Sequence, residues 1–149
     1  MRGLQMDNKQ LPKTKNPLVV RTDFEQRHGW EMICRLIRAP IYVPGDTFHA
    51  NVQFLEDVAF RGLDTEDLLA RVPSDYRHSF LCVVDNTTTT HPEFPILMVD
   101  LRRNRGRSFR AIPSTIQAIE NNLSISNMDF SEFAAATDQD GIFRGFPEP

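Results

Sequence analysis

The sequence predicts a single α/β domain in which helices pack on a mixed five-stranded sheet, with an α+β arrangement as the alternative. Short β-branched runs alternate with segments of helical periodicity in the first half of the chain, as strands and helices do in turn. One later run is apolar on both faces, which is typical of a strand covered by helices on each side. The chain has 149 residues, 40% of them hydrophobic and 25% charged, which fits one globular domain with a core. We therefore predict the order βαβαβββαα.

The first strand and the first helix are predicted by a change of pattern near residue 22. Residues 18–22 form a β-branched run. Asp23 and Gln26 have the spacing of a capping box, which predicts a helix start. The helical periodicity continues to Arg38, and Pro40 stops it.

The second strand and the second helix follow. Residues 49–55 alternate between apolar and polar side chains, as a strand does. Residues 65–71 predict a helix that Pro73 closes.

The second half of the chain predicts three strands and two helices. Residues 79–84 are apolar on both faces and should form the centre of the sheet. Residues 86–95 are expected to be a polar loop. Residues 96–101 and 108–112 flank an arginine-rich turn and predict an antiparallel hairpin.

Two further capping-box spacings predict the last two helices. One begins at Ser114, with Gln117 three residues later, and the other at Asp129, with Glu132 three residues later. We expect one globular domain over residues 17–149.

Charge is distributed unevenly along the chain. All the lysines, Lys9, Lys13 and Lys15, lie in residues 1–16, which we expect to be a flexible leader. Residues 1–15 carry four basic side chains against one acidic side chain, so the remainder carries a formal charge of −6 within a total of −3. An acidic body argues against general nucleic-acid binding, which needs a cationic surface for phosphate contacts.

Several other classes are excluded by what the sequence lacks. No apolar run approaches the roughly 20 residues that cross a bilayer, so we expect no membrane partner. The two cysteines, Cys34 and Cys82, lie in apolar patterns and predict a reducing, cytoplasmic location. The seven glycines form no phosphate-binding loop, and we expect no cofactor and no metal.

Candidate residues for acid-base chemistry lie at strand ends and in the polar loop. Asp85 follows the predicted central strand, and ligands of open α/β sheets bind beyond the carboxyl ends of strands. Arg21 and Asp23, which we select as ligand-binding residues, end the first strand and would meet Asp85 if the two strands are parallel neighbours. His91 can act as a general acid or base, with Asp85 or Asp100 as its counterpart. In the alternative interpretation, Asp23 and Asp85 only cap local structure and Arg21 pairs with one of them.

Candidate residues for anion binding centre on the arginine-rich turn. Arginine binds phosphate or carboxylate with two hydrogen bonds, and Arg102 is the candidate that we select, beside Arg103, Arg105 and Arg107. The alternative is a solvated hairpin whose arginines balance the charge of nearby acidic side chains. The other ligand-binding candidates are Arg77, His78, Asn121 and Asn122.

Several segments resemble one family of uncharacterised small proteins, domain of unknown function 6924. The most specific is Glu120-Asn-Asn-Leu-Ser-Ile-Ser-Asn-Met-Asp-Phe130, and weaker ones include Val20-Arg-Thr-Asp-Phe24 and Phe109-Arg-Ala-Ile-Pro113. The resemblance covers residues 17–146 and implies one small α/β domain. It implies no activity and no catalytic residues.

Two functional hypotheses follow from the sequence. The first is a binding or accessory module that recognises a protein partner or a small anionic ligand. It is favoured because the sequence lacks catalytic and cofactor motifs and has a rim of polar residues at strand ends and in an asparagine-rich segment. The second is a small cofactor-independent enzyme of the isomerase, cyclase or dehydratase type that acts on a metabolite, with His91, Asp85 and Asp100 as its acid-base groups. The sequence leaves open whether the protein is an enzyme.

Overall fold

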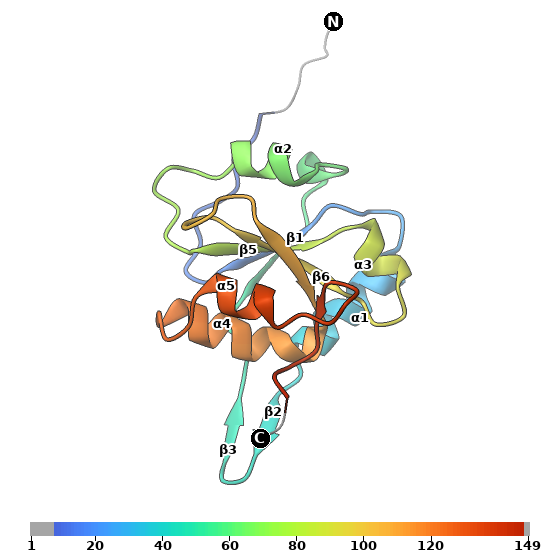
Figure 1. Ribbon diagram of the computed structural model, residues 1–149. Helices are drawn as coiled ribbons and strands as arrows, with labels where there is room; N and C mark the ends of the chain where they lie inside the picture. The colour runs from blue at the N-terminus through green and yellow to red at the C-terminus, as the bar shows by residue number, and fades with distance from the viewer. Residues whose placement is uncertain (1–7, 148–149) are drawn as a thin grey trace, which may run out of the picture.

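The computed structural model describes residues 8–147 and shows a six-stranded mixed sheet with helices packed on it (Figure 1). β5 is paired in parallel with β1 and antiparallel with β6, so the parallel half and the antiparallel half of the sheet meet at β5. This arrangement confirms the predicted α/β class with a mixed sheet. In spatial order the strands are β4 (Gln53–Leu55), β1 (Leu18–Arg21), β5 (Phe80–Val84), β6 (Ile96–Asp100), β7 (Ser108–Ala111) and β8 (Ile142–Phe143).

The central strand β5 is buried on both faces, as predicted. All five of its residues are buried. Cys82 and Val84 belong to the core on one face, whereas Leu81 and Val83 belong to the core on the other. A strand needs an apolar side chain at every position when helices cover both faces.

Helices cover one face of the sheet in the lower part of Figure 1. They are α1 (Arg27–Arg38), α4 (Ile116–Ser124) and α5 (Phe130–Ala135). The core between α1 and the sheet contains Trp30, Ile33 and Ile37, which recur at helical spacing. The apolar stripe that predicts this helix is therefore its packing face.

The opposite face carries α2 (Thr65–Ala70) and the short 3-10 helix η1 (Val58–Phe60). Its core includes Phe60 and Leu68 from these two elements. A capping box in which Asp64 and Asp67 exchange hydrogen bonds fixes the start of α2.

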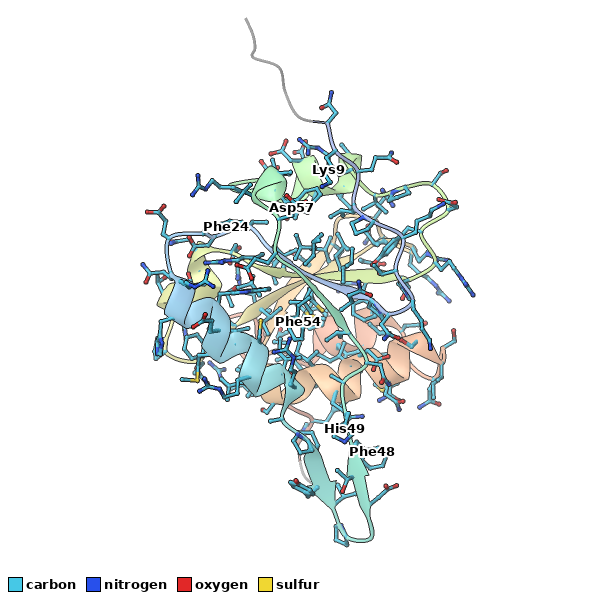
Figure 2. The ribbon with its side chains drawn as sticks, turned by 180° about the vertical axis from the view of Figure 1, so that it is seen from behind. Lys9, Phe24, Phe48, His49, Phe54 and Asp57 are labelled. Atoms are coloured by element: carbon cyan, nitrogen blue, oxygen red, sulfur yellow. The ribbon has the colours of Figure 1, made fainter. Side chains whose placement is uncertain are left out.

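Part of the expected leader also packs on this second face. Residues 8–16, which we call the N-terminal segment, place Leu11 in the core with only 1% of its surface exposed. The Leu11 N–H donates to the carbonyl of Arg71 at 2.8 Å, and Lys9 contacts Asp57 at 2.6 Å (Figure 2). The described part of the expected leader thus contacts the domain, while residues 1–7 lie outside the described residues.

Three strands differ from the five-stranded prediction. β8 adds a sixth strand to the sheet, parallel to β7, and it has only two residues. β2 (Ile41–Val43) and β3 (Asp46–Phe48) form a hairpin that projects from the body of the molecule (Figures 1 and 2). Gly45 has a φ of 86° in its turn. A strand without a buried face lacks the apolar alternation on which sequence prediction depends.

The predicted helix starts are partly wrong. Asp23 does not cap α1, because the N-cap is Gln26 and it makes no side-chain capping bond. Ser114 does not cap α4, since the 3-10 turn η2 (Pro113–Thr115) leads directly into this helix. The start of α5 is confirmed, and Glu132 accepts a hydrogen bond from the Asp129 N–H at 2.9 Å.

The predicted polar loop contains a short helix, α3 (Asn86–Thr90). Threonine is a weak helix former, so composition favours a loop. The Asp85 carboxylate offsets that preference, because it accepts a hydrogen bond from the Thr88 N–H at 3.1 Å and caps the first turn.

Candidate functional site

Asp85 is held in an ion pair at the carboxyl end of β5. The Arg110 guanidinium from β7 donates to both oxygens of this carboxylate, at 3.0 and 2.8 Å. Burial raises the pKa of Asp85, but the hydrogen bond and the charge of Arg110, with the bonds from Thr88, outweigh burial and hold the pKa below its usual value. Asp85 is therefore a charged structural group that already has its partners.

Arg21 is buried at the carboxyl end of β1, with 2% of its surface exposed. Its guanidinium donates to Glu56 at 2.8 Å and to the Asp23 carbonyl at 2.9 Å. It also lies over the rings of Phe24 and Trp30, at 4.4 and 5.6 Å from their centres. Arg21 pairs with Glu56 and not with Asp85, so the predicted contact between Arg21 and Asp85 is wrong.

Asp23 is also occupied by bonds within the protein. Its carboxylate accepts hydrogen bonds from the Glu25 N–H and from the Thr89 hydroxyl of α3. The backbone N–H groups of Thr22 and Asp23 both donate to the Val84 carbonyl. These bonds connect the carboxyl ends of β1 and β5, beside which we expected a ligand pocket.

The two acids proposed for acid-base chemistry lie at opposite ends of β5. Asp100 pairs with Phe80 at the start of the strand, whereas Asp85 follows Val84 at its end. Five residues of strand span about 15 Å, which is beyond the reach of one bridging water. Asp100 also accepts two backbone N–H bonds in its own turn, at 2.9 and 3.1 Å. Asp85 and Asp100 therefore cannot serve one reacting group together.

His91 lies at the C-terminal end of α3, while Asp85 caps the N-terminal end. The Glu93 N–H donates to His91 Nδ1 at 3.0 Å, which leaves Nε2 as the protonated nitrogen of the neutral ring. Glu93 is in turn bound by Arg144. The structure thus gives His91 no partner among Asp85 and Asp100, and a catalytic role for His91 stays a prediction.

A cleft of about 900 Å³ lies instead at the amino ends of β1 and β5. The N-terminal segment, the start of β5, the turn after β6 and the C-terminal end of α4 surround it. Its volume is in the range of small-molecule sites. The polar and charged lining residues are Lys13, Thr14, Lys15, Asn16, Asn51, Arg77, His78, Ser79, Arg102, Glu120, Asn121, Ser124 and Ser126.

Four of the seven predicted ligand-binding residues meet in this cleft, which lies at the edge opposite to the one we expected. They are Arg77, His78, Arg102 and Asn121. Asn122 faces its own turn, where it bonds the Ala118 carbonyl and Asn127. Arg21 and Asp23 are at the other edge.

Four lysine and arginine side chains line the cleft. Among residues 8–147, Lys15, Arg77 and Arg102 form no ion pair, and Lys13 pairs with Asp75. The Arg102 guanidinium donates to the Arg77 carbonyl at 2.8 Å, which fixes it beside the β5 entry. Positive charge that no protein carboxylate neutralises can bind an anion.

His78 stands between this cleft and a smaller one of about 510 Å³. Its Nε2 contacts the Thr14 carbonyl at 2.8 Å, and since a carbonyl only accepts, Nε2 carries the proton. Arg102 also lines both clefts, and Arg105 lines the smaller one. Arg103 pairs with Asp129 outside them. Only part of the arginine-rich turn therefore lines the two clefts.

The sequence missed the lysines, Asn51, Glu120 and Ser124 as cleft residues. Lys13 and Lys15 lie in the segment that we assigned to a flexible leader. Their short distance from β1 in the sequence is the signal that could have placed them, because the entry to a buried strand is held close to the domain.

Both cysteines are buried thiols, and we expect them to resist modification in the folded protein. Burial raises the pKa of Cys34 to about 11 and raises the pKa of Cys82 further. At pH 8 only about one Cys34 in a thousand would be thiolate. Ellman's reagent should therefore react with neither thiol in native buffer and with both in urea. Rapid native labelling of either thiol would contradict this burial.

No helix within residues 8–147 is both long enough and apolar enough to cross a membrane. In the same part of the chain, no group of three or more His, Cys, Asp and Glu side chains is arranged to hold a metal ion.

Fold and cleft together define a single mixed α/β domain with a polar, cation-bearing cleft at one edge of its sheet. The chain belongs to the family described as Domain of unknown function (DUF6924), which matches residues 16–146. This match confirms the family that the sequence resembles. No curated protein matches the chain.

Proposed function

We propose that this protein is a binding module that holds a small anionic ligand in the cleft at the amino ends of β1 and β5. The observation that carries the proposal is the set of three cations, Lys15, Arg77 and Arg102, that line one cleft without a carboxylate partner among residues 8–147. Like charges that line one cleft repel one another, so a bound anion would relieve their repulsion.

The chemistry of the lining supports an anion with hydrogen-bond acceptors. Arginine presents planar donors that match phosphate and carboxylate oxygens, and the Asn16 and Asn121 amides add neutral polar groups. A protein partner with an acidic segment would use the same charges, and a cytoplasmic location is part of this proposal. Small anions are the simplest probe because the cleft is open and about 900 Å³ in volume.

The charge-removing variant Arg77→Gln/Arg102→Gln should weaken the binding of propyl phosphate by tenfold or more. Each substitution removes a charge-assisted contact, which contributes about 1.5 kcal/mol or more. Isothermal titration calorimetry at low and high salt measures the affinity, and binding should weaken as salt rises.

Arg107→Gln is the matched control, because Arg107 lies in the same turn, is exposed and lines neither cleft. It should bind propyl phosphate as the native protein does. If the native protein fails to bind this probe, or the double variant binds it equally well, the cleft is not an anion site.

A further inference from the structure

Glu120 is a buried carboxylate in the lining of the same cleft. Only 4% of its surface is exposed, and it projects from α4. One oxygen accepts the Asn51 N–H at 2.9 Å and the other accepts the Ser124 hydroxyl at 2.7 Å. Among residues 8–147, Glu120 forms no ion pair. Both of its bonds therefore come from neutral donors.

A buried charge with neutral partners alone is costly. A carboxylate has about four acceptor positions, and two are used here. Buried charges are normally paired with an opposite charge or held by several hydrogen bonds. Asp23 and Asp100 are also buried and form no ion pair within residues 8–147, but they line neither cleft. Glu120 differs because it lines a space that a ligand can enter.

A second negative feature lies beside Glu120. α4 ends at Ser124, and the cleft is lined by Leu123 and Ser124 of its last turn and by Ile125 and Ser126, which follow the helix. A helix C-terminus carries a partial negative charge that favours cations, and the last turn of α4 contains no basic residue. This wall is therefore negative, whereas Lys15, Arg77 and Arg102 supply positive charge from other elements.

Apolar surface also belongs to the lining. Pro17, Leu123 and Ile125 contribute it, and Ile125 is 65% exposed. Such surface suits the methylene groups that join two charged ends of one molecule. The cleft thus contains a cation wall, an acid wall and apolar side chains.

Building on the anion cleft proposed above, we infer that its ligand is a zwitterion, whose anionic group binds Arg77 and Arg102 and whose ammonium group binds Glu120. The ammonium group is a counter-charge for the Glu120 carboxylate, and its N–H groups can donate to the unused acceptor positions of that carboxylate. The ligand class is an amine joined by a short aliphatic spacer to a phosphate or carboxylate.

The test compares two series of probes of equal length in isothermal titration calorimetry. The first series is ω-aminoalkyl phosphates with spacers of increasing length, and the second is the alkyl phosphates that end in a methyl group. The aminoalkyl probe with the best spacer should bind native protein about tenfold more tightly than its alkyl counterpart, as one ion pair of about 1.4 kcal/mol gives. N-acetylation of that probe removes the positive charge and should abolish the gain.

Glu120→Gln should remove the preference for the amine, so that the aminoalkyl and alkyl phosphates of equal length bind this variant equally well. Glutamine keeps an oxygen for the Asn51 N–H and an amide for the Ser124 hydroxyl, so the fold should persist. Glu66→Gln is the matched control, because Glu66 is an exposed acid of α2 outside the cleft lining. It should retain the preference in full.

The outcomes of these titrations distinguish the zwitterion, the role of Glu120 and the anion cleft. Equal binding of the two series to native protein would overturn the zwitterion and leave the anion cleft intact. A preference that survives Glu120→Gln would overturn the assignment to Glu120. Failure of every phosphate to bind would overturn the proposed function and this inference with it. If Glu120→Gln does not fold, binding of the acetylated probe to native protein decides whether the ligand is a zwitterion.

Discussion

Replacing Leu11 with alanine is expected to lower the free energy of unfolding by about 3 kcal/mol, within the range for buried leucines. Leu11 is 1% exposed and belongs to the core beneath α2 and η1. The substitution leaves a cavity in a layer that contains few other elements. Urea unfolding followed by the fluorescence of the single tryptophan, Trp30, measures the change.

Leu36→Ala is the matched control, since it deletes the same atoms from a side chain of α1 that is 39% exposed. Its effect should stay below about 1 kcal/mol. If Leu11→Ala is no more destabilising than Leu36→Ala, the N-terminal segment does not pack on the domain in solution. The Lys13 and Lys15 wall of the cleft would then lose its support.

The sequence predicted the elements whose signals are local and failed where a signal depends on a distant partner. The apolar run of β5 and the Asp129 to Glu132 cap were predicted because strand burial and capping leave a mark within a few residues. β8 was missed because two residues show no period, and its place is set by pairing with β7. The β2–β3 hairpin was missed because its residues are exposed or half-buried.

The candidate site shows the same division. Arg77, His78, Arg102 and Asn121 were selected by residue type, and type was enough to find cleft residues. The cleft lies at the edge of the sheet opposite to the one that we predicted. At the predicted edge Asp85 is bound by Arg110, which lies 25 residues further along the sequence and which the general rule for open sheets does not take into account. No pattern in the residues around Asp85 indicates that Arg110 is its partner.

Asp85→Asn should destabilise the protein by about 2 kcal/mol at pH 7, because it removes a charge-assisted pair and leaves Arg110 without its counter-charge. The two side chains are 27% and 22% exposed, so water screens the pair only in part. Asparagine still caps α3, which limits the effect to the lost charge. Asp85→Ala loses the cap as well and should cost about 3 kcal/mol in total.

The pH dependence of this loss identifies its cause. The folded pKa of Asp85 lies below the unfolded value of about 3.9, so the stabilisation is fully present above that value. It is lost as pH falls through the folded pKa, because the protonated carboxyl no longer attracts Arg110. The difference in unfolding free energy between native protein and Asp85→Asn should therefore be constant from pH 7 to about pH 5 and shrink below about pH 4.

The other carboxyl groups contribute equally to the unfolding free energies of native protein and of Asp85→Asn, so their contributions cancel in the difference. Glu31→Gln serves as the control, because its pair with Arg27 is exposed on α1 and should add little at any pH. A native-minus-Asn difference that does not shrink in acid would mean that the negative charge of Asp85, and therefore its ion pair with Arg110, is not the source of the stabilisation.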